Sequence, residues 1–364
     1  MTHEITLAAL DGANPLGMLA ALGAFRVATL LDDEATMHWV QQPGWRPVLT
    51  TQRTEDELVE GILAELHRLA GPAAREKRLQ ELRGAASKLE KEKAKKGKNA
   101  PAAERRAAIE AEESVLASGI AALEAPGQQP GLGLVDAHDL VAVAREEYRR
   151  HAEPALRASI APTVPCDADF YAALGCDGIL KEKNGVGPAV EPTPFSFSNG
   201  GSGKCLLKDF RNCAARASAP VLGRILSGKM EKADELTSLL WDPADQQSYA
   251  LRWTDPGDSK NKAKCNATAN ALAFLGLACV PAVPHGTRLR AVGMDNRLRR
   301  WAWPLWGAPL DLATTRALLA TPAIQDADAP GAARTLAALG IHQVYASRRF
   351  FLNKRPFFSP ARAL

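Results

Sequence analysis

The stretch at residues 192–210, PTPFSFSNGGSGKCLLKDF, constrains the fold most, because its glycines and polar residues are too dense for ordinary packing. Three glycines can adopt positive φ angles and let a partner's backbone come close: Gly200, Gly201 and Gly203. Short polar residues and one lysine surround them: Ser198, Asn199, Ser202 and Lys204. We interpret residues 198–204 as a binding loop, called the glycine loop below.

Phosphate is the ligand class that suits the glycine loop. Exposed backbone amides beside one cation resemble the concave nests that bind anions, and the apolar residues after the loop would anchor it to a core. A nucleotide-binding P-loop needs a glycine where Ser198 stands and a hydroxyl residue where Cys205 stands, so ATP or GTP binding is disfavoured. Contact with a phosphodiester backbone and a solvated turn are the two remaining interpretations.

A chain of 364 residues, of which 46% are hydrophobic, is long enough for two or three domains with a real core. It contains no run of 18 uncharged apolar residues, and its first residues lack the basic flank and cleavage pattern of a signal peptide. We therefore expect a folded cytoplasmic protein with no membrane partner.

The six cysteines predict reduced thiols that are mostly packed. They form no CxxC pair and have no histidine at ligand spacing, which argues against a zinc site and against a disulfide framework. We expect neither a metal nor a cofactor.

The net charge of +4 is unevenly distributed along the chain. Residues 196–364 carry 23 Lys and Arg against 12 Asp and Glu, a net charge of +11, which leaves −7 for the rest of the chain. This asymmetry indicates an anionic partner for the second half, with nucleic acid first and an acidic protein or membrane surface second. The alternative is that these charges only keep the surface soluble.

Helical patterns and short strands are mixed along the chain, so we expect an α+β fold with two lobes. Asn14 and Pro15 should begin an apolar helix at residues 16–31. A turn is expected at residues 44–47, between strands at 37–40 and 48–51. Further helices are expected at residues 54–69, 134–151, 209–226 and 267–277.

Composition divides the chain into four expected segments. They are an N-terminal α+β segment at residues 1–70, an inserted helical arm at 71–126, a linker and helical segment at 127–195, and a basic α+β lobe for nucleic acid at 196–364. The arm shows apolar a/d spacing on two stretches with a basic break between them, which predicts an antiparallel helical hairpin. It could be a solvated projection, a docking site for a partner protein, or a contact to the DNA backbone.

Basic residues beyond the glycine loop add candidate contacts to nucleic acid. Arg211 and Asn212 lie on the helix expected after the loop. Lys260, Lys262 and Lys264 alternate, so on an extended strand they would share one face at intervals of about 6 to 7 Å, close to phosphate spacing.

Two groups of aromatic residues each allow two interpretations. Trp301, Trp303 and Trp306 follow an arginine-rich stretch and could stack on bases, although buried strand aromatics are commoner. The tail interleaves basic and aromatic residues around Arg348 and Arg349, and it can stack on an unpaired strand or dock against the protein's own core.

The dipeptide His138-Asp139 suggests a metal-dependent phosphohydrolase as an alternative function. That chemistry needs further histidines and aspartates converging on two metals, and the sequence offers no second matching motif. A histidine on a helix surface is the simpler interpretation.

Two segments resemble stretches of a known family. LDGANPLGMLAALGAFRV at residues 10–27 and SNGGSGKCLLKDFRN at residues 198–212 are similar to parts of the large subunit of type I CRISPR effector complexes (Cascade), in particular the type I-G group, formerly I-U. The segments LRWTDP and WAWPLW match more loosely.

The resemblance implies a non-enzymatic, DNA-binding subunit of a ribonucleoprotein. Its expected partners are target DNA, CRISPR RNA, other subunits of the complex and a separate helicase-nuclease. In this family the large subunit reads a short motif beside the target and steadies opened strands, while base pairing reads the sequence. An alternative from another class is a scaffold whose helical arm recruits a partner.

The candidate site contains no catalytic residue. The contacts implied by the resemblance are Asn199, Gly200, Gly201, Gly203, Lys204, Lys208, Arg211 and Asn212. The charge pattern adds Lys260, Lys262, Lys264, Arg348 and Arg349.

Overall fold

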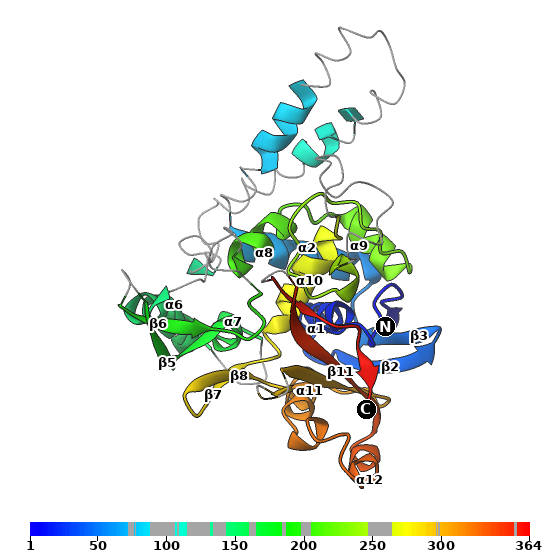
Figure 1. Cartoon of the computed structure of the whole chain (residues 1–364). Helices are drawn as coiled ribbons and strands as arrows, with labels where there is room; N and C mark the ends of the chain where they lie inside the picture. Colours follow the sequence, from blue (N-terminus) through cyan, green and yellow to red (C-terminus); the bar gives the residue numbers. More distant parts are fainter. Residues whose placement is uncertain are drawn as a thin grey trace.

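The structure, a computed structural model, has helices and small antiparallel sheets, which confirms the α+β class (Figure 1). None of the described helices is long and apolar enough to cross a membrane. The described residues are 1–71, 76, 78–87, 106–107, 109–114, 132–133, 143–159, 165–183, 187–197, 205–246, 264–295, 297, 299–352 and 355–364.

The N-terminal sheet has the order β1-β3-β2 and is antiparallel, with β1 at His3–Thr6, β2 at Thr36–Gln42 and β3 at Gly44–Thr51. The predicted turn at residues 44–47 is wrong, because these residues already belong to β3. The chain reverses at Pro43, and Gly44 provides the left-handed backbone (φ +82°) that the tighter reversal needs.

Helix α1, Pro15–Leu31, begins as the sequence predicts. The Asn14 side chain accepts hydrogen bonds from the backbone N–H groups of Leu16 and Gly17, and Pro15 occupies the first turn. Helix α2, Glu55–Ala70, starts with a capping box between Thr54 and Glu57. Both helices are confirmed at their expected places.

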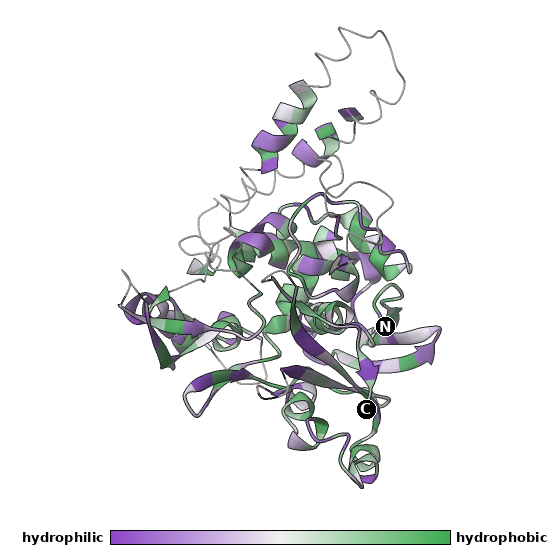
Figure 2. Cartoon of the chain, viewed as in Figure 1, coloured by the Kyte–Doolittle hydropathy of each residue, from purple (hydrophilic) through white to green (hydrophobic). Residues whose placement is uncertain are grey.

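Helix α10, Ala267–Leu277, crosses α1 with backbone in contact with backbone, at the centre of the molecule (Figure 1). A Cβ atom on Gly23 would lie 2.0 Å from the carbonyl oxygen of Leu272, and one on Gly276 would lie 1.9 Å from the carbonyl oxygen of Leu19. All residues of α10 are buried. Figure 2 shows the corresponding hydrophobic centre.

The helix predicted at residues 209–226 is two helices, α8 at Leu206–Ala214 and α9 at Ala219–Leu226. Pro220 explains the break. A proline has no N–H to donate to the carbonyl four residues earlier and clashes with that carbonyl, but it fits the first turn of a new helix. Phe210 fixes α8 to the core by stacking on Phe274 of α10, with ring centroids 3.8 Å apart.

The C-terminal sheet has the order β12-β11-β10-β9, and β13 also pairs with β11. Its strands are antiparallel: β9 at Met294–Asp295, β10 at Arg300–Trp306, β11 at Ile341–Leu352, β12 at Arg355–Phe358 and β13 at Arg362–Ala363. Every residue of β10 is buried, so the tryptophans are core residues and base stacking by them is excluded.

Two tryptophans of β10 connect this sheet to the N-terminal part of the chain. The indole N–H of Trp303 donates to the carbonyl of Gly12 at 2.7 Å, and that of Trp306 donates to the carbonyl of Met37 at 2.8 Å. One cluster of buried hydrophobic residues includes side chains from Ile5 to Phe358. The N-terminal segment and the basic lobe therefore share a core, while the proposed domain boundaries stay predictions.

The middle of the chain forms a smaller sheet with the order β4-β6-β5 (Figure 1, green). Its elements are β4 at Val143–Ala144, α6 at Arg145–Arg157, α7 at Asp167–Leu174, β5 at Gly175–Lys183 and β6 at Gly187–Pro192. The helix predicted at residues 134–151 is wrong at 143–144, which lie in β4. Residues 134–142 lie outside the described residues.

A hairpin of β7, Ala282–His285, and β8, Arg288–Ala291, lies beside this sheet. Between β10 and β11 the chain forms α11 at Leu312–Leu319, a 3-10 turn at Pro322–Ile324 and α12 at Ala332–Ala338.

Residues 78–87 and 109–114 of the predicted arm are helical and project from the body (Figure 1). Arg78 joins the two segments through a pair of hydrogen bonds to the carboxylate of Glu112, at 2.8 and 3.2 Å. Arg216, between α8 and α9, lies 3.3 Å from the carboxylate of Glu81 and holds the arm to the body. The remaining residues of the predicted hairpin lie outside the described residues.

Candidate nucleic-acid interface

Strand β11 brings Arg349 to the beginning of the glycine loop. The guanidinium carbon of Arg349 lies 5.1 Å from the ring centroid of Phe197, the last described residue before the loop. Its Nη1 donates to the carbonyl of Pro194 at 3.2 Å. The tail therefore lies against the residues that directly precede the glycine loop, although the two stretches were predicted separately.

Arg349 belongs to an alternating stack of arginine and phenylalanine side chains. Its guanidinium carbon is also 5.5 Å from the ring centroid of Phe351, and the guanidinium carbon of Arg299 is 5.9 Å from the same centroid. Phe197 packs at its inner end against Phe358, with centroids 4.8 Å apart. We call Arg299, Phe351, Arg349 and Phe197 the arginine–phenylalanine stack.

The two arginines of the stack have no carboxylate partner among the described residues. The Nε atom of Arg349 is buried and has no hydrogen-bond partner there. Burial, and then the positive charge of Arg299, lower the pKa of Arg349 from its ordinary value. Two like charges held together without compensation favour the arrival of an anion.

Local backbone geometry builds this arrangement. Arg299 has a left-handed backbone (φ +51°), and its carbonyl accepts a hydrogen bond from the backbone N–H of Arg349 at 2.7 Å. Successive residues of a strand point to opposite faces, so Arg349 and Phe351 share one face of β11. Arg348 and Phe350 share the other face, where Phe350 lies against Phe357 of β12.

Neighbouring Arg300 shows how an ordinary structural arginine differs from those in the stack. Arg300 is buried, and its guanidinium donates to the carboxylate of Asp328 at 2.9 Å and to the carbonyl of Gln325 at 2.5 Å. Its charge is therefore compensated within the protein, whereas that of Arg299 is exposed to solvent.

The predicted site residues divide into three groups. Arg349 lies in the stack, and exposed Arg348 lies on the opposite face of β11. Lys208, Arg211 and Asn212 are half-buried on α8, the first helix after the loop. The glycine-loop residues lie outside the described residues: Asn199, Gly200, Gly201, Gly203 and Lys204.

The lysine stripe is only partly within the described residues. Lys264 is exposed and precedes Cys265, which forms an isolated β-bridge with Asp234. Lys260 and Lys262 lie outside the described residues, so their shared face stays a prediction.

Sequence reasoning missed Arg299, Phe351 and Phe197 as parts of the site. A signal was present, because residues 288–300 are rich in arginine and the tail interleaves basic and aromatic residues. The combination depends on the register of β10 and β11, in which Arg300 faces Arg348, and this register is not visible in the sequence.

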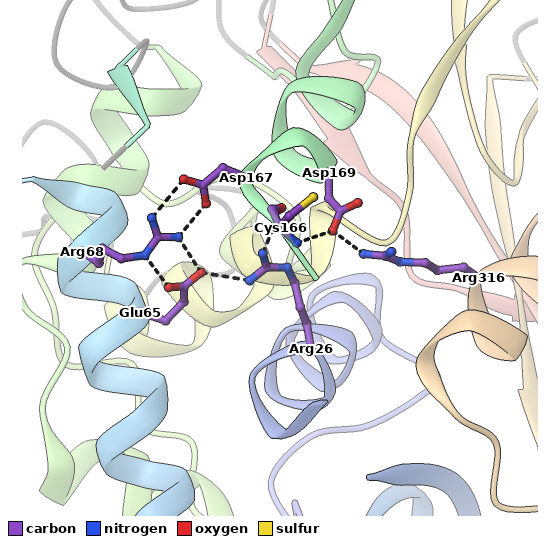
Figure 3. Close-up of polar contacts among 7 residues, drawn as sticks. All are labelled: Arg26, Glu65, Arg68, Cys166, Asp167, Asp169 and Arg316. Atoms are coloured by element: carbon purple, nitrogen blue, oxygen red, sulfur yellow. Dashed lines mark hydrogen bonds and ion pairs between the residues drawn. The ribbon is translucent and has the colours of Figure 1, made fainter. Parts of the chain in front are cut away.

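A second cluster of arginines pairs with the protein's own groups (Figure 3); Arg26 is buried in it, and Arg68 and Arg316 are half-buried. Arg26 of α1 donates to the carboxylate of Glu65 at 2.9 Å and to the carbonyl of Cys166 at 3.1 Å. Arg68 binds the same Glu65 at 2.7 Å and also the carboxylate of Asp167, at 2.6 Å.

The cluster continues to α11 through Asp169. The carboxylate of Asp169 accepts hydrogen bonds from the backbone N–H of Cys166 at 3.0 Å and from Arg316 at 2.7 Å. The result is a partly buried charge network of three arginines and three carboxylates: Arg26, Arg68, Arg316, Glu65, Asp167 and Asp169. Its charges balance, so the network fastens α7 to α1, α2 and α11 and leaves no net charge for an anion.

Electrostatics at Glu65 agree with a structural role. Burial would raise the pKa of Glu65, but the hydrogen bonds and charges of Arg68 and Arg26 outweigh it and hold the pKa below its ordinary value. The carboxylate is therefore ionised and is needed to compensate Arg26, whose side chain is only 1% exposed.

A third polar cluster lies where residues 229–246 meet the start of α1. Lys232 bridges the carboxylates of Asp242 at 2.7 Å and Asp245 at 2.6 Å, and the Asn14 side-chain amide donates to Asp242 at 3.1 Å. Burial raises the pKa of Asp245, although the charge of Lys232 opposes this effect. The cluster joins the start of α1 to the short 3-10 turn at Pro243–Gln246.

All six cysteines are free thiols, and four of them are buried: Cys205, Cys213, Cys265 and Cys279. Burial raises the pKa of Cys265 to about 12 and raises the pKa of Cys213 as well. The expectation that the cysteines are mostly packed is confirmed, and their reduced state stays a prediction.

Within the described part of the chain, no group of three or more His, Cys, Asp or Glu side chains is placed to hold a metal ion. His138 and Asp139 lie outside that part. No protein-family model, no curated protein and no solved structure matches this chain.

Proposed function

We propose that this chain is a non-enzymatic protein that binds nucleic acid through the arginine–phenylalanine stack and the adjoining glycine loop. The observation that carries the proposal is the position of Arg349, a half-buried arginine without a carboxylate partner among the described residues, beside Phe197, the last described residue before the loop. Nucleic acid offers the phosphates that Arg299 and Arg349 lack.

The distribution of charge supports the same partner. The stack and α8 both lie in residues 196–364, where the net charge is +11. A cation-rich surface attracts a polyanion and releases its condensed counterions on binding, which makes affinity fall with salt.

More specifically, the chain is proposed as the large subunit of a CRISPR-RNA-guided effector complex of type I, in the cytoplasm. The support is the resemblance of residues 10–27 and 198–212 to that family, together with the place of these segments in the fold. The first contributes α1 and the second contributes α8, and both helices pack against α10. The acidic remainder of the chain, with a net charge of −7, suits contacts to neighbouring subunits.

Copurification tests whether the chain belongs to the proposed complex, and a salt titration tests whether it binds nucleic acid through the stack. The chain, isolated from its host, should bring a small RNA and further subunits with it. In the purified assembly, Arg349→Gln should weaken binding of target DNA and reduce the slope of log affinity against log salt by about one unit, as for one lost phosphate contact.

Arg334→Gln is the matched control, because Arg334 is an exposed arginine on α12 and is not part of the stack. It should leave both affinity and slope unchanged. An Arg349→Gln protein that keeps wild-type affinity across the salt series would remove the stack from the binding site. A chain that purifies without RNA or partner subunits would contradict the proposed complex but not nucleic-acid binding.

A further inference from the structure

We infer that a hollow at the C-terminal end of α1 is a docking surface for a partner protein, and that it takes an apolar side chain flanked by lysine or arginine residues. The hollow has a volume of about 520 Å³ and is lined by residues 29–33, 52 and 53. This inference goes beyond the proposed function, because it concerns a protein partner and does not depend on the stack or on nucleic-acid binding.

Helix α1 reaches the surface at this hollow. Its residues Pro15–Thr29 are all buried, whereas Leu30 is 42% exposed and Leu31 is half-buried. Leu31 packs against Gly61 of α2, where a Cβ atom would lie 2.6 Å from one of the leucine methyl groups. An apolar side chain that stays in water inside a concave surface is a place where a partner can bury an apolar side chain of its own.

The cation of the lining is already paired. Among the residues that line the hollow, all of them described, Arg53 is the only cation. Its Nε donates to the carbonyl of Leu31 at 2.9 Å, and its Nη1 lies 3.5 Å from the carboxylate of Glu57. Asp33, in contrast, is exposed and has no ion-pair partner among the described residues. The lining therefore keeps a negative charge that the protein does not balance.

The second carboxylate of the lining, Asp32, is held in place and ionised. Burial would raise the pKa of Asp32, but hydrogen bonds from the backbone N–H of Gln52 at 2.6 Å and from the hydroxyl of Thr51 at 2.7 Å hold it below its ordinary value. The rigid link between α1 and the start of α2 thus fixes the shape of the hollow before a partner arrives.

The end of α1 adds to the negative potential. The last backbone carbonyls of a helix carry partial negative charge, so cations stabilise this end and carboxylates do not. The last turn of α1 contains no basic residue, and its C-cap Asp32 is followed directly by Asp33 and Glu34. An incoming lysine or arginine would supply the cation that this helix end lacks.

Acidic residues are concentrated around the hollow. Residues 1–71 contain ten Asp and Glu, four Arg and no Lys, a net charge of −6. Seven of the ten acidic residues lie at residues 32–34 and 55–60, in the segments that contain or directly follow the lining residues. Two of the four arginines, Arg26 and Arg68, belong to the partly buried charge network. The surface therefore attracts a basic partner and repels nucleic acid.

The two features together specify the chemistry of the partner. An apolar contact inside a rim of charges is the usual arrangement of a protein–protein interface. Lysine and arginine also carry apolar stems, which can lie along Leu30 while their charged ends reach the carboxylates. A partner segment that places an apolar residue between basic residues satisfies both features.

The test measures the binding of short labelled peptides to the purified full-length chain by fluorescence anisotropy. The probe peptide has one central leucine between lysine residues. Two comparison peptides replace the leucine by serine or the lysines by glutamate. The wild type should bind the probe about tenfold more tightly than the serine peptide, and it should not bind the glutamate peptide.

Two variants of the hollow test its two features. Leu30→Ser should weaken probe binding about tenfold, as expected for loss of a buried apolar contact. Asp33→Asn should weaken it about threefold, and this difference should disappear at high salt because exposed charges are screened.

Leu339→Ser and Glu182→Gln are the matched controls. Leu339 is 43% exposed, close to the value for Leu30, and Glu182 is an exposed carboxylate outside the hollow. Neither substitution should change probe binding. Melting temperatures of all four variants confirm that they are folded.

Three results would overturn the inference. They are equal losses from Leu30→Ser and Leu339→Ser, equal binding of the lysine and glutamate peptides, and binding that depends on Asp33 alone, which would be non-specific attraction between charges. Self-association of the full chain in sedimentation velocity, abolished by Leu30→Ser, would assign the hollow to a second copy instead. None of these results bears on nucleic-acid binding, which Arg349→Gln tests outside the hollow.

Discussion

Arg349 lies over the ring of Phe197, with 5.1 Å between the guanidinium carbon and the ring centroid. This contact joins the C-terminal tail to the residue that precedes the glycine loop, although the two are far apart in the sequence. The functional importance of Arg349 depends on whether a carboxylate balances its charge. The partly buried charge network pairs three arginines with three carboxylates, whereas Arg349 and Arg299 face no carboxylate among the described residues.

Arg299→Gly should separate binding from stability. Arg299 has a left-handed backbone that glycine adopts without strain, and this relief of about 1 kcal/mol offsets the greater freedom that glycine has in the unfolded chain. The free energy of unfolding should therefore change by less than about 1 kcal/mol, while affinity for nucleic acid falls. Denaturant unfolding and anisotropy measure the two quantities, and a large loss of stability would show that Arg299 is chiefly structural.

Gly23→Ala should strongly destabilise the protein, because the added Cβ would lie 2.0 Å from the carbonyl oxygen of Leu272 in α10. Separating the two helices should destabilise the fold by about 3 kcal/mol, which exceeds the stabilisation from the higher helix propensity of alanine. Gly223→Ala in α9 is the control. A Cβ atom there meets nothing within 4 Å, so stability should rise by roughly 0.5 to 1 kcal/mol, as measured by urea unfolding. Equal effects of the two substitutions would contradict the close crossing.

Glu65→Gln should destabilise the fold by about 3 kcal/mol, because it leaves the buried charge of Arg26 without a counter-ion. Glu60→Gln, on the exposed face of the same helix, should change stability by less than about 0.5 kcal/mol. Chemical unfolding at neutral pH measures both. A similar, small effect of the two variants would show that the network contributes little to the stability of the fold.

The same carboxylate predicts a pH dependence. The pKa of Glu65 lies below its ordinary value of 4.5, so near that pH the unfolded chain binds more protons than the folded protein. The stability that the ionised carboxylate contributes is present above about pH 4.5 and is lost as pH falls through the folded-state pKa. The stability difference between wild type and Glu65→Gln should therefore narrow at acid pH. A difference that stays constant from pH 7 to pH 3, in roughly the range where this carboxyl group titrates, would contradict the assignment.

The sequence correctly predicted the helices that are marked by capping residues or by an apolar run. Asn14 and Pro15 mark the start of α1, Thr54 and Glu57 mark the start of α2, and the apolar run of α10 has the expected bounds. These signals work because caps and helical periodicity depend on neighbouring residues. The β5–β6 hairpin was not predicted, since its strands mix glycine, proline and charged residues and are defined by their pairing.

The candidate site was predicted in part. Arg349 and the glycine loop were named, but their proximity was not, and Arg348 was named with Arg349 although the pleat of β11 places the two on opposite faces. Arg299 enters the site through its backbone bond to Arg349 and its contact with the ring of Phe351, and both depend on long-range strand register. Register of this kind is set by the whole sheet and not by local sequence.

Photo-crosslinking tests the central claim most directly. A single-stranded oligonucleotide with 5-iodouracil is bound to the purified assembly and irradiated, and the modified peptides of this chain are identified by mass spectrometry. The account predicts adducts at Phe351, the exposed ring of the stack, and their loss in the Arg349→Gln protein. Adducts confined to other surfaces, such as α11 and α12, with none at Phe351, would contradict it.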